Sequence, residues 1–443
     1  MAHPIQVSGI GSDSSAQQSQ PGPQIPSIHV EVRQVLVPIV VTDSKGHSVL
    51  GLRSSDFKIF EDGLEQKIVS LTSEADGAAR LFEPQPALPA PGTELVSPSP
   101  QQIGKADRAY LVVIDTLNSE FGNFAQIRAA LKKLFGEAQP ASTLYGLVAL
   151  SRTANVVQPL TTDPSAVLRA LENKQFTKFI LASEQSSRAL SEIQLRRMLE
   201  DYCQKCPCQF GQPGGICSQP GPALERIESF AASAGEEDAS QLRSFLEQLG
   251  GLVQQLGMLP GKRAIVLISD GFTIQPGYDL FELIAIYLRD PEIALQDPVA
   301  RMEAQVDAVL RLADDRNVVF YTIDSRGVYV VPPGGYDVTG PPMSSKMAPI
   351  VMPQIQSQKT SSAAERDDGL HELAEATGGL FFGNSNDTLK GMRRALADGR
   401  AYYVLLYNPS NRAADGKFRK VQVLVDKRNL RIRAKQGYWA PAQ

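Results

Sequence analysis

The sequence has few histidines, the residue type that most often supplies metal ligands and catalytic bases. Its 443 residues include four, and they are scattered along the chain at His3, His29, His47 and His371. Scattered histidines offer neither a metal-binding triad nor a catalytic base with partners nearby. We therefore interpret all four as surface or packing residues.

Long apolar runs and nucleotide-binding motifs are also missing. No stretch approaches the roughly 20 apolar residues that a membrane-spanning helix needs. The chain has no P-loop, no G-x-S-x-G and no dinucleotide-binding G-x-G-x-x-G, so we expect a protein that is not an enzyme. The formal net charge is −4, which gives no reason to expect nucleic acid as a partner.

Cysteine is confined to one short stretch. The four cysteines are spaced C-x2-C-x-C-x8-C, at Cys203, Cys206, Cys208 and Cys217. Two disulfides and a single four-thiolate zinc site both remain open. We favour disulfides, because the spacing fits no standard zinc ribbon and a cysteine-rich insert in one loop suits an extracellular protein.

Two stretches have the composition of unstructured chain. Residues 1–27 are rich in Ser, Gln, Pro and Gly and lack the basic and apolar regions of a signal peptide, which predicts a disordered leader. Such a leader also commonly follows a signal cleavage site. Residues 75–107 are rich in Pro, Ala and Ser and predict a linker.

Two apolar runs that end in an aspartate stand out in the middle of the chain. Residues 109–119 read AYLVVIDTLNS and residues 264–271 read AIVLISDG, so the acids Asp115 and Asp270 follow runs typical of buried parallel strands. The carboxyl ends of parallel strands form the binding crevice of an open α/β sheet. Carboxylates and hydroxyls gathered there would suit a hard divalent cation.

The remaining patterns predict an α/β domain inserted within a β domain. Strand-like and helix-like segments alternate over residues 108–399, which predicts a doubly wound, mostly parallel sheet with helices on both faces. Residues 183–240 interrupt this alternation as an insert that carries the cysteines. Residues 28–74 and 400–443 both have β patterns, and we expect them to complete one β-sandwich together. We also predict a loop over residues 330–364.

In their order along the chain, these motifs resemble a von Willebrand factor type A domain. The carrying elements are the Asp115 strand, LYGLVALS, NVVQPLTTD, IVLISDG, VVFYTID and LAEATGGLFF. The flanking VPIVVTDSKGHSVLGLRSSDFKIFEDG and the closing YYVLLYNP and GYWAP resemble, more narrowly, the acidobacterial von Willebrand factor A-related family. The resemblance covers residues 30–440, and the cysteine insert is its main departure.

The resemblance implies a metal-ion-dependent adhesion site. Such a site is written D-x-S-x-S, with a Thr and an Asp on later loops, and it binds Mg²⁺ or another divalent cation. Asp115 and Ser119 match the motif and Asp270 matches the later Asp, whereas Leu117 stands where the first Ser should be. No clear counterpart of the Thr is present, and the candidates are Thr177, Ser183 and Ser186.

The expected function is therefore that of a non-enzymatic adhesion or protein-binding module. Its upper face would engage a protein partner, through a divalent cation and an acidic side chain of that partner. Two alternatives stay open: a metal-independent structural assembly protein, which Leu117 favours, and a phosphoryl-transfer hydrolase that uses Asp115. The resemblance further implies export to the periplasm, the cell surface or the medium.

Overall fold

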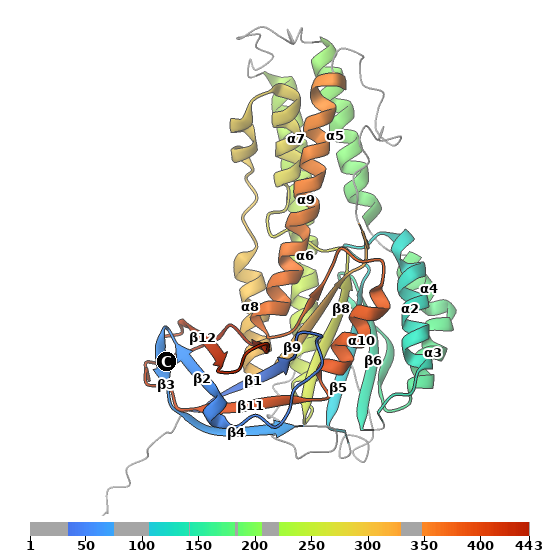
Figure 1. Cartoon of the computed structure of the whole chain (residues 1–443). Helices are drawn as coiled ribbons and strands as arrows, with labels where there is room; N and C mark the ends of the chain where they lie inside the picture. Colours follow the sequence, from blue (N-terminus) through green and yellow to red (C-terminus); the bar gives the residue numbers. More distant parts are fainter. Residues whose placement is uncertain are drawn as a thin grey trace, which may run out of the picture. The chain divides into compact units, whose positions relative to one another are not determined.

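The protein is described here from a computed structural model, which covers residues 34–74, 106–140, 142–181, 185–205, 221–328 and 348–442. The residues from Gln34 to Gln443 form one compact unit. The predicted leader lies outside the described residues, as does almost all of the predicted linker. Figure 1 shows the arrangement of the helices and strands.

A six-stranded, mostly parallel sheet forms the centre of this unit (Figure 1). Its strand order is β10-β9-β8-β5-β6-β7, and only the β6–β7 pair is antiparallel. The strands are β5 (Arg108–Asp115), β6 (Thr143–Leu150), β7 (Ala154–Thr161), β8 (Lys262–Ser269), β9 (Val318–Asp324) and β10 (Phe381–Phe382). The prediction of a mostly parallel α/β sheet is confirmed. Every residue of β5, β6, β8 and β9 is buried, which explains their continuous apolar sequences.

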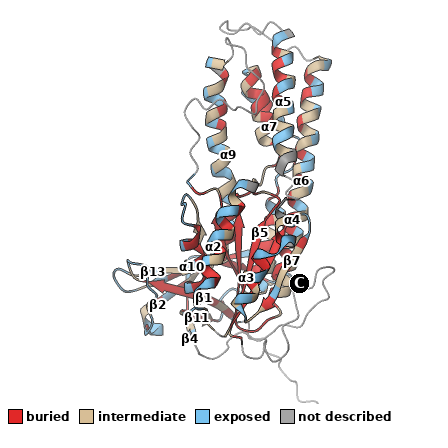
Figure 2. Cartoon of the chain, turned by 90° about the vertical axis from the view of Figure 1, so that its right-hand side faces the viewer, coloured by how far each residue is buried: buried red, intermediate tan, exposed pale blue. Residues whose placement is uncertain are grey.

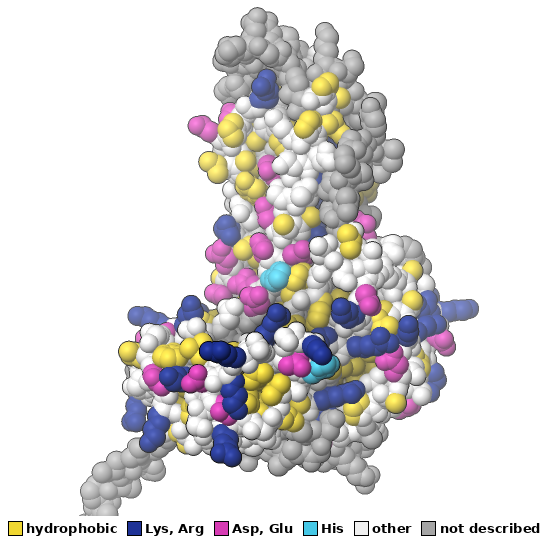
Figure 3. Space-filling view, in the orientation of Figure 1, with side chains coloured by type: hydrophobic (Ala, Val, Ile, Leu, Met, Phe, Trp, Pro, Cys, Tyr) yellow, Lys and Arg dark blue, Asp and Glu magenta, His cyan; other side chains and the backbone are white. Residues whose placement is uncertain are grey.

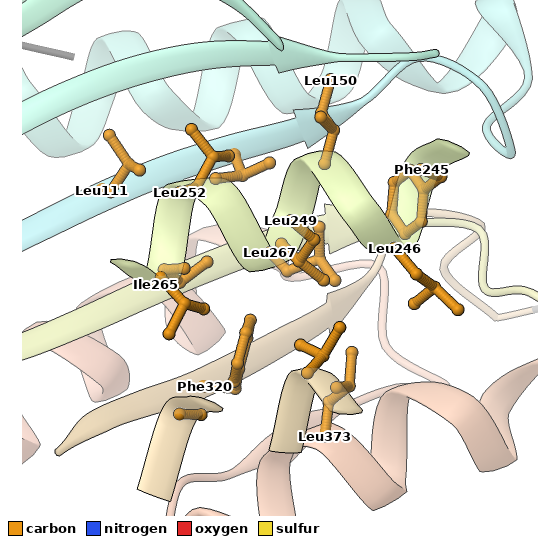
Figure 4. Close-up of a cluster of buried hydrophobic side chains, with 14 of the residues drawn as sticks. Leu111, Leu150, Phe245, Leu246, Leu249, Leu252, Ile265, Leu267, Phe320 and Leu373 are labelled. Carbon is orange, nitrogen blue, oxygen red and sulfur yellow. The ribbon is translucent and has the colours of Figure 1, made fainter. Parts of the chain in front are cut away.

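Helices cover both faces of this sheet. Alternate residues of β5 point to opposite faces, so Leu111 and Val113 belong to one apolar cluster and Val112 and Ile114 to the other. The first cluster is completed by α6 (Pro222–Leu256), α8 (Glu303–Asp315) and α9 (Ala348–Ala376), and Figure 4 shows part of it. The second is completed mainly by α2 (Phe124–Gly136), α3 (Pro164–Glu172) and α10 (Thr388–Asp398), with α4 (Lys174–Leu181) beside them.

Two four-stranded antiparallel sheets combine strands from before and after the α/β segment. Their orders are β13-β1-β11-β4 and β14-β12-β2-β3. The strands are β1 (Val35–Thr42), β2 (Phe57–Glu61), β3 (Leu64–Gln66), β4 (Ile68–Glu74), β11 (Tyr402–Tyr407), β12 (Phe418–Val425), β13 (Arg431–Ala434) and β14 (Gly437–Trp439). Both sheets contribute to one apolar core, which includes Val37, Ile59, Leu405 and Val423. The division of the chain into separate domains stays a prediction.

Local sequence signals explain several features of these sheets. Asp62 and Gly63 join β2 to β3 with positive φ angles of 48° and 83°, as expected of an Asp-Gly hairpin. Pro38 lies in β1, which has neighbours on both sides, but pairing with β13 begins only at Ile39. The proline therefore sits at a local edge, where a missing N–H is tolerated. Exposed and buried residues alternate along β12, and its two basic residues, Arg419 and Lys420, are buried and exposed respectively. Figure 3 shows further Lys and Arg side chains on the surface of this part of the molecule.

Four helices continue beyond the carboxyl edge of the parallel sheet and share a third apolar cluster. We call them the upper bundle: α5 (Gln185–Lys205), the first half of α6, α7 (Tyr278–Leu288) and the first half of α9. The short 3-10 helix η3 (Pro291–Gln296) packs against α7. In Figure 2 buried residues run through these helices as well as through the sheet.

The sequence-based prediction of this region was wrong in two respects. The predicted loop over residues 330–364 contains the first turns of α9, which begins at Ala348 and includes Pro353. Val351 and Ile355 are buried in the upper bundle, and this packing outweighs the poor helix propensity of the proline. The insert also does not end before the next helix, because α6 runs without interruption from Pro222 to Leu256.

Candidate functional site

Asp115 ends β5, and its carboxylate is held entirely by uncharged donors. Oδ1 accepts hydrogen bonds from the backbone N–H groups of Leu117 and Asn118, both at 2.9 Å. Oδ2 accepts from the Asn118 amide at 2.9 Å and from the Ser269 hydroxyl at 2.6 Å. The carboxylate therefore fixes the turn after β5 and ties it to the end of the neighbouring strand, β8.

Asp270, one residue beyond β8, is held in the same way. Oδ2 accepts from the backbone N–H of Glu120 at 2.7 Å, Oδ1 accepts from the Ser325 hydroxyl, and the Asn123 amide donates to both oxygens. The backbone N–H of Asp270 donates in turn to the Ser119 hydroxyl at 3.0 Å. The structure thus brings Asp115, Ser119 and Asp270 together at the carboxyl ends of β5 and β8.

These three residues are enclosed by the protein. Asp115 and Ser119 have no exposed surface and Asp270 is 1% exposed. Burial raises the pKa of Asp115 to about 6, against the opposing effect of its hydrogen bonds. Burial likewise raises the pKa of Asp270. Both acids are shielded from solvent and serve as acceptors for the loops around them.

The arrangement does not fit a divalent cation bound to these carboxylates. Each of the four carboxylate oxygens already accepts two hydrogen bonds from the chain, so no acceptor position is left for an ion. Leu117 is 4% exposed and packs into the apolar cluster under α6, which leaves no oxygen at the motif's second position. Among the described residues, no group of three or more His, Cys, Asp and Glu side chains is placed to hold a metal ion.

The structure describes only part of the other predicted ligand set. Thr177 lies in α4 and is partly exposed, and no hydrogen bond connects it to Asp115 or Asp270 in the described ranges. Ser183 lies outside the described residues, and Ser186 lies in the first turn of α5. Cys203 is buried near the end of α5, whereas Cys206, Cys208 and Cys217 lie outside the described residues. The choice between disulfides and zinc stays a prediction.

Several residues of the site were not found from the sequence. Asn118, Asn123, Ser269 and Ser325 supply the side-chain donors to the two carboxylates. For Asn118, Ser269 and Ser325 the available signal was a position next to a strand end, because strand ends of a parallel sheet meet at one edge. A third strand-end acid, Asp324 of β9, is held within its own turn: the Arg326 backbone N–H and Nε both donate to its carboxylate at 2.9 Å.

A network of arginines and carboxylates joins the upper bundle to this edge of the sheet. Arg188 of α5 lies 2.7 Å from Asp279 of α7 and 3.6 Å from Asp238 of α6. Arg326 contacts Asp367 of α9 in addition to Asp324. Each arginine thus bridges two carboxylates, and the helices are fixed relative to one another at their base.

Between this network and Asp270 lies a cleft of about 220 Å³, which we call the edge cleft. It is lined by residues of the sheet edge, α5, α7 and α9, namely Glu120, Glu192, Asp270, Asp279, Leu280, Leu283, Arg326, Gln358, Lys359, Ser362, Ala363 and Arg366. A larger and more apolar groove, of about 650 Å³, lies between α6 and α8, away from the strand-end acids. The edge cleft is therefore an opening that reaches the candidate site.

With this geometry in view, the chain is a mixed α/β protein with one mostly parallel sheet and two antiparallel sheets. No protein-family model matches the chain. No curated protein matches it either. Solved structures do match, 33 chains in all.

Three of these structures come from bacteria. An aerotolerance-related membrane protein from Bacteroides fragilis is 13% identical and covers 65% of this chain and 98% of its own, with a TM-score of 0.25. The conserved hypothetical protein BatB from Bacteroides thetaiotaomicron is 14% identical, with 65% and 97% coverage and a TM-score of 0.25. An uncharacterized membrane spanning protein from Vibrio fischeri is 14% identical, with 65% and 96% coverage and a TM-score of 0.15.

Likeness at this level carries no functional argument for the present chain. The resemblance to the von Willebrand factor type A domain stays a prediction, as does export from the cytoplasm. Within the described ranges, no helix is both long and apolar enough to cross a bilayer.

Proposed function

We propose that this protein is a non-enzymatic binding module that engages a protein partner at the carboxyl edge of its parallel sheet, without a metal ion. The edge consists of the loops held by Asp115 and Asp270 together with the edge cleft. The von Willebrand factor A resemblance motivates this choice of face. The observation that carries the metal-independent form is the complete hydrogen bonding of both carboxylates by donors of the chain itself.

A rigid edge supports a role in recognition. The loop after β5 is held to β8 through Ser269 and Asp270, and the loop after β9 is held to the same point through Ser325. Surfaces that are fixed before binding lose less conformational entropy when a partner docks. In the proposed function the two acids therefore hold the loops of the edge in place and do not contact the partner themselves.

The enzymatic alternative finds little support in this geometry. A phosphoryl-transfer nucleophile must present a carboxylate oxygen to its substrate. Asp115 has no exposed surface, and both of its oxygens accept two hydrogen bonds. A metal-dependent adhesion site remains the second candidate, favoured by the strand-end positions of Asp115, Ser119 and Asp270.

Site-specific photo-crosslinking in the organism of origin would test the proposed face. A photoreactive amino acid would replace Glu120, which is exposed and lines the edge cleft. The matched control would carry it at Lys67, an exposed residue between β3 and β4. We expect a discrete protein adduct from position 120 and none of that size from position 67. Adducts that are absent at both positions, or equal at both, would contradict the proposal.

A further inference from the structure

Arg366 of α9 is half-buried at the edge cleft, where it has no partner among the described residues. Among the described residues, its guanidinium has no hydrogen bond and no ion pair, although Asp279 and Asp270 lie near enough to act on it electrostatically. Burial and the neighbouring Arg188 lower the pKa of Arg366 from its ordinary value. A guanidinium that lines a cleft and leaves its five N–H donors unused within the described chain is available to a group that arrives from outside.

Most of the other charged groups around the cleft are already engaged, and the exposed Glu120 has no ion pair among the described residues. Asp279 is paired with Arg188, Glu192 with Arg196, and Arg326 with Asp324 and Asp367. Asp270 accepts hydrogen bonds on both oxygens. An incoming anion at Arg366 therefore has no need to displace an existing ion pair of these groups.

The backbone of Arg366 is fixed beside the candidate site by Gly271. At Gly271, where φ is 82°, a Cβ atom would lie 2.4 Å from the carbonyl oxygen of Arg366. Glycine thus lets α9 approach the turn after β8 as closely as backbone packing permits. Because Gly271 directly follows Asp270 in the sequence, this contact places the backbone of Arg366 close to Asp270.

We propose that Arg366 recognises a carboxylate side chain of the protein partner, taking the place that a divalent cation holds in metal-dependent adhesion sites. This inference rests on the proposed function. A planar guanidinium matches a carboxylate with two parallel hydrogen bonds. The cleft of about 220 Å³ is smaller than the usual pockets for small molecules, which span roughly 300–1,000 Å³, and suits the end of one side chain.

The test uses the full chain labelled with ¹⁵N-arginine and follows side-chain Nε–H signals by NMR. The signal of Arg366 is assigned as the one that is lost in Arg366→Gln. The probe is the blocked tripeptide Ala-Glu-Ala, and the matched probe is Ala-Gln-Ala. We expect Ala-Glu-Ala to shift the Arg366 signal with a dissociation constant on the order of 1–10 mM, which is typical of one such contact, and Ala-Gln-Ala to leave it unchanged.

Three results would overturn the inference. The first is an Arg366 signal that does not respond to Ala-Glu-Ala, or responds equally to Ala-Gln-Ala. The second is a response to inorganic phosphate without a response to the peptide, which would assign the site to a different anion. The third is an Arg366→Gln variant that is strongly destabilised while the wild-type signal ignores the peptide, because Arg366 would then be a counter-charge for Asp279.

Variants separate this inference from the proposed function. Arg226 is exposed on α6, so Arg226→Gln is the matched control for the loss of one arginine. We expect Arg366→Gln to lower the yield of the position-120 adduct at least about tenfold, and Arg226→Gln to leave it unchanged. An adduct that persists in Arg366→Gln would overturn the role of Arg366 but keep the partner. A peptide response without any adduct would instead contradict the protein partner.

Discussion

At the scale of single residues, the Asp115 carboxylate is buried among donors that carry no charge. Burial opposes its ionisation more strongly than the hydrogen bonds favour it. Its pKa of about 6 in the folded chain exceeds the ordinary value of 3.8. Between these pH values the folded chain holds more protons than the unfolded chain. The contribution of this group to the free energy of unfolding is therefore full below pH 3.8 and is lost as the pH rises through 6.

Replacing the acid by its amide makes this dependence measurable. We expect the stability of wild type relative to Asp115→Asn to fall by up to about 3 kcal/mol between pH 4 and pH 7, in denaturant titrations at several pH values. Asp163→Asn is the control of opposite sign, because the hydrogen bond from Arg169 lowers the pKa of exposed Asp163. Parallel pH profiles for wild type and Asp115→Asn would contradict the assignment.

The filled carboxylates also predict the outcome of a metal titration. We expect no saturable heat when Mg²⁺, Mn²⁺ or Ca²⁺ is titrated into the chelator-treated protein, because every oxygen of Asp115 and Asp270 already accepts two hydrogen bonds. The Asp115→Ala variant should give the same trace. Saturable binding that disappears in this variant would instead support the hypothesis of a metal-dependent adhesion site.

The sequence predicted where the two acids lie but not what surrounds them. Strand-end positions follow from apolar runs, since those runs are buried on both faces. The donors Asn118 and Asn123 come from a loop whose fold depends on Asp270, about 150 residues further along the chain. Arg366 is harder still to foresee, because nothing in its local sequence shows that it lies beside Gly271.

At the scale of elements, Gly271 controls how closely α9 approaches β8. We expect Gly271→Ala to lower the free energy of unfolding by roughly 3 kcal/mol or more, because the new Cβ meets the Arg366 carbonyl and φ is positive. Gly51→Ala isolates the part of this cost that comes from the positive φ angle, since φ is 83° there and no atom lies within 4 Å of the new Cβ. That control should cost about 1 kcal/mol. Equal costs for the two variants in denaturant titrations would show that α9 is not held at this point.

The base of the upper bundle gives a second prediction at this scale. Arg188 is 25% exposed and bridges Asp238 and Asp279, so Arg188→Met leaves two carboxylates without their cation. We expect a loss of about 3 kcal/mol in unfolding free energy, of which Asp279→Asn in the same chain restores a part. Arg152→Met removes an exposed ion pair with Glu237 and should cost less than about 1 kcal/mol. A similar small cost at Arg188 would rule out its bridging role.

Helices of the upper bundle mark the limit of prediction from pattern. The helices on the sheet have one apolar face, and their periodicity indicated them. The α7 helix is apolar on most sides and α9 contains Pro353, so neither has the expected pattern. Both are stabilised by the shared core with α5 and α6, and that core is a tertiary feature that no single segment displays.

At the scale of the whole molecule, β1 lies between two strands that come from the other end of the chain. It pairs with β11 on one side and with β13 on the other, and Val37 and Ile39 have no exposed surface. We expect a chain that stops at residue 399 to lose hydrogen-exchange protection in β1 while β5 and β8 keep theirs. A synthetic peptide of residues 400–443 should restore protection. Protection of β1 without that peptide would contradict the pairing.

Contacts also connect these sheets to the α/β segment. Arg433 pairs with Asp398, Lys435 pairs with Asp314, and the Lys262 ammonium lies 4.6 Å from the centre of the Tyr402 ring. These contacts connect the antiparallel sheets to α10, α8 and β8. The two antiparallel sheets are therefore attached to the α/β segment by direct side-chain contacts.

The position of β1 also sets an order of events during synthesis. About 360 residues separate Thr42 from Tyr402, so a ribosome working at about 5–20 residues per second needs roughly 20–70 s to make the partner strand. During this time the backbone groups on both edges of β1 lack their partner strands, and unpaired strand edges promote association with other chains. We therefore expect β1 to be covered during synthesis, by a chaperone or by the growing α/β segment, until β11 and β13 are made.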